Sequence, residues 1–489
     1  MDMEVADWLY GMLKVGDVLT SKGCNGGTTM LITNGSRGIS FTDFTLYGNS
    51  AGMAFAETDT LSGVVYNRVY DTTRNGEIID EATYNAYLAI EEKYGVDLEI
   101  SMDDLGRFRG SPCHIGSIDA THTTRCAQGS QATSCLFENM CDDATNQNAM
   151  HARLAEVKDN GDGTATLVYK ANLADYHYAV YGKLTNPVNF CADFKVGDRV
   201  FIYTAAGQLV CDTPALSATQ YLGSESFSWA DHGFPEAGTG TVEKRSVTVD
   251  MASINMAAIA GLDLRDNHHR TDNKVLVDNM SQASNGFKFD NCKFQNIRSR
   301  GLLIKASGGT IQNCTFRNIG MSCAAILYEI WWGESGVTEN MLVDRNLIDH
   351  TGFFENRDNY SPISIEGLGQ SVDEDYLLYK NITISNNRII NRTTNYAVYI
   401  NSAKDVKIIN NYFGEFVGND FTNHTEAPES ASAPKPVIHI NGAMNVEISG
   451  NRYPLTGSIQ DQIVAERNKN VYGSDVELDG IPLFPDRLN

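Results

Sequence analysis

A pair of neighbouring aspartates, Asp142 and Asp143, stands in the run C-D-D-A-T-N. Like charges side by side repel each other, and aspartate is uncommon within strands. A solvated turn would explain the pair. A cluster of catalytic carboxyl groups would also explain it, because glycoside hydrolysis uses one carboxylic acid and one carboxylate on the two sides of the bond that breaks.

A third aspartate, Asp119, lies in S-I-D-A-T-H, 23 residues before Asp142. If the chain repeats with a period of this length, Asp119 and Asp142 lie on neighbouring turns of the repeat. Carboxyl groups that close raise each other's pKa, so one keeps its proton near neutral pH while another is ionised. Asp119, Asp142 and Asp143 are therefore the predicted catalytic residues, and a solvated or calcium-binding ladder is the alternative.

Polar and aromatic residues nearby are predicted to bind a substrate. His122 and Asn146 follow the aspartates, and Arg300 stands in R-S-R-G-L-L-I. A structural role would equally suit His122, and Arg300 either contacts sugar hydroxyls or pairs with an acid. The run L-Y-E-I-W-W-G-E-S-G adds Glu329, Trp331, Trp332 and Glu334. The two tryptophans belong either to the core or to a wall that stacks on the apolar face of a sugar.

The elements that must position these residues repeat along the second half of the chain. An apolar strand, an asparagine and further apolar residues recur at 289–297, 311–319, 343–351, 384–392, 408–416 and 448–453. The spacing is 22 residues from Asn291 to Asn313 and 24 from Asn387 to Asn411. Short strands with this period predict a parallel β-helix, in which each coil stacks on the next. Asparagine suits the corners because it tolerates left-handed backbone.

The predicted fold is all-β, and four parts make up the chain. The first part of the β-helix spans 1–152, with a helical excursion over about 76–105. Hairpin signals, among them a D-G turn, replace the asparagine corners over 153–265 and predict an inserted small antiparallel β-barrel-like domain. The β-helix continues over 266–475, and 476–489 form a tail.

Composition limits the partners and the cofactors. The net charge of −23 argues against nucleic acid, whose phosphates need a basic surface, and no apolar run is long enough to predict membrane insertion. The ten cysteines include no C-x-x-C pair, so no zinc site of that kind is expected. Cys292 and Cys314 occupy matching points of two repeats and are either buried thiols or a disulfide.

The stretches that carry the aspartates resemble glycoside hydrolase family 110. That family has a D-A-T-H-F stretch, then M-D-D-A-x-N-V-H-G, R-A-R-G-I-L and W-x-E-S-G. The same order occurs here in D-A-T-H, C-D-D-A-T-N, R-S-R-G-L-L and W-G-E-S-G. The resemblance covers roughly 15–155 and 265–475. This chain departs from the pattern at Asn148, where the family has a histidine, and at Tyr328 and Glu329, near an aspartate-containing loop of the family.

The resemblance implies a right-handed parallel β-helix enzyme without metal or organic cofactor. It implies an inverting, exo-acting glycosidase that removes terminal α-1,3-linked galactose, with Asp119, Asp142 and Asp143 lining the active site. The expected partner is a glycan with a terminal galactose-like sugar. Export, to the periplasm or out of the cell, is expected from this theme, although the first residues contain no signal peptide and the N-terminus could be incomplete. The oligomeric state, a homodimer included, is open.

Two other functions compete with the glycosidase. A polysaccharide lyase on a β-helix needs a basic residue to remove a proton, and Arg300 is the one candidate in this acid-rich set. A carbohydrate-binding solenoid without catalysis would use the aspartates structurally. The fold does not decide among the three functions, so the acidic triad is the feature that discriminates.

Overall fold

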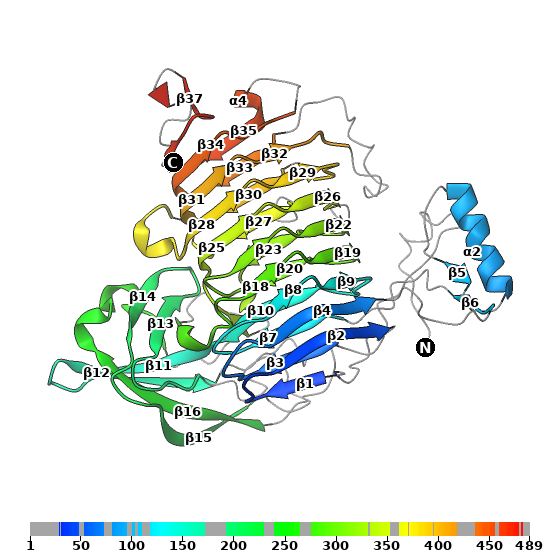
Figure 1. Ribbon diagram of the computed structural model, residues 1–489. Coiled ribbons are helices and arrows are strands. Elements are labelled where there is room, and N and C mark those ends of the chain that lie inside the picture. The colour runs from blue at the N-terminus through cyan, green and yellow to red at the C-terminus, as the bar shows by residue number, and fades with distance from the viewer. Residues whose placement is uncertain are drawn as a thin grey trace.

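The computed structural model describes most of the body of the protein. The described residues are 29, 31–47, 53–72, 81–94, 100–102, 106–109, 118–171, 192–228, 239–264, 275–330, 333–352, 361–369, 371–394, 396–417, 436–454, 459–478 and 481–482. The protein is nearly all-β, and two long sheets of parallel strands run side by side through most of it (Figure 1).

The first sheet holds the predicted site. Ten of its strands follow one another in parallel, and a short eleventh, β24, pairs antiparallel with β10. In order across the sheet, the strands are β1 (Leu31–Asn34), β3 (Phe55–Thr58), β7 (Thr121–Thr124), β10 (Thr145–Met150), β20 (Leu302–Ile304), β23 (Ala324–Leu327), β27 (Ile363–Glu366), β30 (Val398–Asn401), β33 (Ile438–Asn441) and β35 (Ile463–Glu466), with β24 (Glu334–Ser335) beside β10.

Most turns of the chain contribute one strand to the first sheet and two strands to the second sheet. Its 16 strands in the described residues are β2 (Ser40–Tyr47), β4 (Val65–Thr72), β8 (Gln131–Thr133), β9 (Leu136–Glu138), β18 (Lys288–Asp290), β19 (Lys293–Ile297), β21 (Thr310–Gln312), β22 (Thr315–Ile319), β25 (Glu339–Asp344), β26 (Leu347–Thr351), β28 (Tyr379–Ser385), β29 (Arg388–Ile390), β31 (Ala403–Ile409), β32 (Tyr412–Phe413), β34 (Met444–Ser449) and β36 (Lys469–Tyr472). The chain therefore passes back and forth between the two sheets, as the repeat period requires.

The core between the sheets is built from ladders of equivalent residues. Phe137 pairs in register with Phe294, and Phe294 with Phe316. The rings of Phe294 and Phe316 stack with their centroids 4.7 Å apart, which is the spacing of neighbouring strands, about 4.8 Å. Each strand thus buries its apolar face against the strands above and below it.

The asparagines of the repeat occupy two different positions. Asn291, Asn313, Asn386 and Asn410 take positive φ at the corner between two strands, as the sequence predicts for a corner asparagine. Asn387 and Asn411 come one residue later and point inward, with 1% of their surface exposed. The predicted asparagine corner is therefore right for the first group and wrong by one residue for Asn387 and Asn411.

The inward position forms a hydrogen-bonded ladder. Asn387 Nδ2 donates to Asn411 Oδ1 (3.0 Å), and Asn411 Nδ2 donates to Asn451 Oδ1 (3.0 Å). At the same position, Cys314 lies two coils before Asn387 and Cys292 three coils before it, and both are free thiols that are almost fully buried. The sequence left open whether this pair forms buried thiols or a disulfide, and the structure contains the thiols.

A seven-stranded antiparallel sheet lies beside the lower end of the stack (Figure 1). Its order is β14 (Leu209–Pro214), β13 (Arg199–Thr204), β17 (Val275–Asn279), β11 (Ala152–Asp159), β12 (Thr164–Ala171), β16 (Thr239–Asp250) and β15 (Gln220–Ser228). β11 and β12 form the hairpin predicted around the D-G turn, and β13 pairs with β14 in a second hairpin. The barrel-like closure and the boundaries 153–265 stay predictions.

The remaining elements are short. The helix α2 (Glu81–Tyr94) lies in the segment where the sequence predicts a helical excursion, and Figure 1 shows it apart from the stack with β5 (Ser101–Met102) and β6 (Phe108–Arg109). The others are α4 (Ile459–Gln462), β37 (Glu477–Leu478), β38 (Ile481–Pro482) and the 3₁₀ turns η3 (Met251–Ser253), η4 (Met256–Ile259), η5 (Met280–Gln282) and η8 (Glu374–Tyr376). Among the described helices, none has the length and apolar character needed to cross a membrane.

Candidate active site

Parallel pairing brings the two acidic stretches together. β7 and β10 are neighbours in the first sheet, and their register sets His122 beside Asn146. Asp119 therefore precedes β7 at the same level at which Asp143 precedes β10. The backbone N–H of Asp143 donates to Asp119 Oδ1 at 3.2 Å. One turn of the stack is 24 residues here, so Asp119 matches Asp143, and the predicted spacing of 23 residues to Asp142 is one residue short.

The aspartate pair lies in a bend before β10 and not within a strand. The bend resolves the difficulty that adjacent residues of a strand point to opposite faces. Asp143 is buried, with 3% of its surface exposed, whereas Asp142 is partly exposed. The two aspartates thus occupy different environments although they are neighbours in the sequence.

Arg300 binds Asp143 twice. The Arg300 Nε donates to Asp143 Oδ1 at 2.8 Å, and its backbone N–H donates to the same oxygen at 3.0 Å. A guanidinium nitrogen of Arg300 also donates to Glu329 Oε1 at 3.0 Å. Of the two roles open to Arg300 in the sequence, pairing with acids is the one that the structure contains.

Glu334 closes the other side of the cluster. Its Oε1 lies 3.7 Å from His122 Nε2, and Asn146 Nδ2 donates to its Oε2 at 3.1 Å. The other nitrogen of His122, Nδ1, lies 2.9 Å from Asp119 Oδ2. Asn148, which stands where the resembling family has a histidine, contacts His122 Nε2 through its amide nitrogen at 3.2 Å.

A buried lysine completes the cluster. Lys305 Nζ lies 2.6 Å from Glu334 Oε2 and 3.0 Å from Glu329 Oε2. The contacts form a closed ring through Asp119, His122, Glu334, Lys305, Glu329, Arg300 and Asp143. The sequence analysis missed Lys305, because a lone lysine after an apolar strand has no motif around it.

Burial and charge move the pKa values of the ring in different directions. Burial raises the pKa of Asp143 to about 7; the Arg300 charge opposes this shift, and the charges of Asp142 and Asp119 add to it. Burial also raises the pKa of Asp119, and the hydrogen bond with His122 offsets only part of the effect. The sequence predicts that carboxyl–carboxyl repulsion raises these values, whereas desolvation is the larger cause here.

Neighbouring charges favour the charged forms of His122 and Glu329. Burial by itself would lower the pKa of His122, but the hydrogen bond with Asp119 and the charge of Glu334 raise it above its usual value. Burial would raise the pKa of Glu329, yet Lys305 and Arg300 together lower it to about 2. Glu329 is therefore an anion at any physiological pH.

The site lies on the outer face of the first sheet. Next to Asn146 in register is Leu303, which packs with Ala325 and Leu327 in a small apolar cluster separate from the main core. Trp331 and Trp332, the predicted sugar-stacking wall, lie outside the described residues. Within the described part of the chain, no three His, Cys, Asp or Glu side chains are grouped so as to hold a metal ion.

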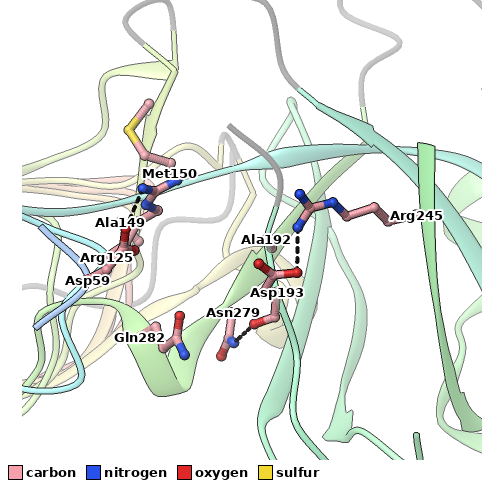
Figure 2. A pocket seen from close by; sticks show the side chains of 9 residues that line it. All are labelled: Asp59, Arg125, Ala149, Met150, Ala192, Asp193, Arg245, Asn279 and Gln282. Atoms are coloured by element: carbon pink, nitrogen blue, oxygen red, sulfur yellow. Dashed lines mark hydrogen bonds and ion pairs between the residues drawn. The ribbon is translucent and has the colours of Figure 1, made fainter. Parts of the chain in front are cut away.

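A cavity of about 160 Å³ lies near the end of β10 (Figure 2). Its wall includes Met150, whose backbone pairs with Glu334. Arg125 pairs with Asp59 at 2.7 Å on one side of the cavity, and Arg245 pairs with Asp193 on the other. None of the predicted site residues lines this cavity, so it is separate from the acidic ring.

Comparison with known proteins finds a weak similarity over part of the chain. No family model matches the chain. The chain is 24% identical over 340 residues to alpha-1,3-galactosidase A of Shewanella woodyi. The alignment covers 69% of this chain but 45% of that relative, so the chain spans less than half of the relative's length. The similarity is therefore weak and partial.

Proposed function

We propose that this protein is an exo-acting, inverting glycoside hydrolase that removes terminal α-linked galactose from glycans. The proposal includes membership of glycoside hydrolase family 110 and a body that is a right-handed parallel β-helix. It also includes the predicted division into 1–152, the barrel-like insertion 153–265, 266–475 and the tail. The substrate is a glycan that the enzyme meets after export.

One observation carries the proposal: two buried aspartates from neighbouring coils meet, and the backbone N–H of Asp143 donates to the Asp119 carboxylate at 3.2 Å. A glycosidase needs carboxyl groups that differ in protonation at the same pH. The raised pKa of Asp143, about 7, leaves a substantial fraction of this group protonated near neutral pH. Asp142 is the more exposed member of the pair and is open to water.

In the proposed reaction Asp143 gives its proton to the glycosidic oxygen. Asp142 takes a proton from the water that attacks the anomeric carbon from the opposite side. Inversion needs room for this water, so about 6.5–9.5 Å should separate the two reacting carboxyl groups. Asp119 orients the pair through the Asp143 N–H, and Asn146, Glu334 and the two tryptophans supply contacts for the sugar.

The test is a product screen over chromogenic and natural α- and β-galactosides, followed by proton NMR of the first sugar released. We expect β-galactose from an α-linked substrate. Asp142→Asn and Asp143→Asn should each lower kcat by at least about 10³-fold while the thermal midpoint is kept. An unsaturated uronate among the products would indicate a lyase. Glycan binding that none of the aspartate variants changes, without any product, would indicate a binding protein.

A further inference from the structure

Lys305 is sealed inside the molecule next to the acidic ring. Its side chain is 0% exposed, and its backbone N–H donates to Gln147 O at 2.8 Å. Gly336 packs on the Lys305 carbonyl so closely that a Cβ at Gly336 would lie 1.6 Å from that oxygen. The ammonium group therefore cannot reach a substrate, and its effect on the site must pass through its neighbours.

One path leads from Lys305 to Asp143. Glu329 accepts from Lys305 with Oε2 and from Arg300 with Oε1, each at 3.0 Å. Arg300 in turn donates to Asp143. Because Glu329 is held between two cations, it fixes the guanidinium plane in the orientation that binds Asp143.

A second path leads from Lys305 to Asp119. Lys305 Nζ contacts Glu334 at 2.6 Å, and Glu334 faces His122, which contacts Asp119. Glu329 and Glu334 are also joined by an antiparallel bridge of their backbones. Lys305 thus belongs to both chains of contacts. It is the cation between Glu329 and Glu334, which the backbone holds close together.

We propose that Lys305 is a positioning residue that holds Glu329 and Glu334 apart and thereby sets the charge states of Asp143 and Asp119 together. This inference rests on the proposed function. A buried ammonium group without partners would give up its proton. Here the two glutamates keep Lys305 charged, and its pKa lies above the usual value although burial opposes this.

The test replaces Lys305 with methionine, which keeps the chain length and removes the charge. Loss of a nearby cation raises the pKa of carboxyl groups. The limb of the bell-shaped pH profile that Asp143 sets should therefore move to higher pH by about one unit, and kcat should fall by at least about 10-fold with less than about 3-fold change in KM. The matched control is Lys170→Met, because Lys170 is also buried and pairs with Glu225 at 2.8 Å in the antiparallel sheet.

A charge-balanced double variant separates electrostatics from packing. Lys305→Met with Glu334→Gln restores the net charge of the ring and should bring the pH profile at least halfway back to that of the wild type. It also gives a folded protein to study if the single variant does not fold. A profile that Lys305→Met leaves within about 0.2 pH units of the wild type overturns the inference, even if the wild type releases galactose.

If the wild type cleaves no galactoside, the proposed function fails. The role of Lys305 is then tested by the pKa of His122. The positive charge of Lys305 lowers the pKa of His122. The imidazole NMR titration, assigned with a His122→Gln variant, should therefore shift upward by at least about half a pH unit in Lys305→Met and not in Lys170→Met. An unchanged titration would overturn the role of Lys305 independently of any substrate.

Discussion

Two buried carboxyl groups of the ring, Asp143 and Glu329, show how partners decide ionisation. The pKa of Asp143 is raised to about 7 and that of Glu329 is lowered to about 2. Both lose hydration, which favours the neutral form. Glu329 lies against two cations, Lys305 and Arg300, whereas Asp143 has one cation and several carboxyl neighbours. The balance of neighbours, and not burial alone, gives the ring its mixed protonation.

A third buried carboxyl group, Glu57 in β3, permits a direct test of this reasoning. Tyr66 Oη and Ser130 Oγ donate to Glu57 Oε1 at 2.7 and 2.8 Å, and among the described residues no cation hydrogen-bonds to it. Burial raises its pKa from the usual 4.5 to about 7. The folded state then binds a proton that the unfolded chain releases, so stability falls as pH rises from about 4.5 to 7.

Glu57→Gln imitates the protonated acid and should remove this loss. We expect little change in the free energy of unfolding at pH 4.5 and a gain of up to roughly 3 kcal/mol at pH 8. Urea unfolding of the variant and the wild type at the two pH values measures this change in the free energy of unfolding. Asp290→Asn is the control of opposite sign, because hydrogen bonds from Asn313 and Gln312 outweigh slight burial and lower the pKa of Asp290. A variant of Glu57 that is less stable than the wild type at pH 8 would contradict the account.

At the scale of the elements, the buried asparagine ladder joins one coil to the next. Asn411 accepts from the Asn387 backbone N–H at 2.9 Å and donates to Ile384 O at 3.0 Å, besides its ladder partners. Asn411→Ala would leave these buried groups without partners. We expect a loss of about 3 kcal/mol by urea unfolding.

The control for the ladder is Asn445→Ala, at a left-handed position near the start of β34. Asn445 also has positive φ, 55°, and donates to Asp405 at 2.9 Å near the surface. Water replaces that bond, so the cost should be about 1 kcal/mol, chiefly from the left-handed backbone. Equal losses for Asn411 and Asn445 would show that the inward ladder contributes nothing beyond the corners.

The hairpin that carries Glu329 and Glu334 docks on the stack through Gly336. This glycine has φ +123° and lies against the Lys305 carbonyl. Gly336→Ala must therefore move the hairpin, and we expect a loss of more than about 3 kcal/mol together with loss of the ring. Gly308→Ala is the control: φ is +68°, but the nearest atom lies 3.6 Å from the added Cβ. Its cost should stay near 1 kcal/mol, and similar midpoints for the two variants in thermal unfolding would contradict the close approach.

Sequence spacing predicted the parallel elements because the strand period and the corner asparagines are local properties. It also brought Asp119 to Asp143, since one coil is one period. It could not find Lys305, whose partners Glu329 and Glu334 lie 24 and 29 residues further along the chain. Nor could it separate Asn386 from Asn387, because left-handed backbone and inward burial are properties of the folded corner.

At the scale of the whole molecule, acid groups outnumber basic ones, with 61 Asp and Glu against 38 Lys and Arg. Besides Glu57 and Asp143, Asp278 in β17 is fully buried, and burial raises its pKa to about 7. These three groups lie in different parts of the fold. Each binds a proton in the folded state between its ordinary pKa and about 7, so their effects on stability have the same sign.

The protein should therefore be most stable on the acid side of neutrality. From about pH 5 to pH 8 the folded state gives up these protons, and repulsion among the remaining charges grows, so we expect the thermal midpoint to fall by on the order of 10 °C. Below about pH 4.5 the trend reverses, because the unfolded chain then binds a proton at position 329 that the folded state, in which the pKa of Glu329 is lowered to about 2, does not bind. Calorimetry from pH 4 to 9 at fixed ionic strength measures the curve. Added salt screens surface repulsion but not buried groups, so a fall that 0.5 M salt abolishes would assign the effect to net charge and refute the role of the three buried acids.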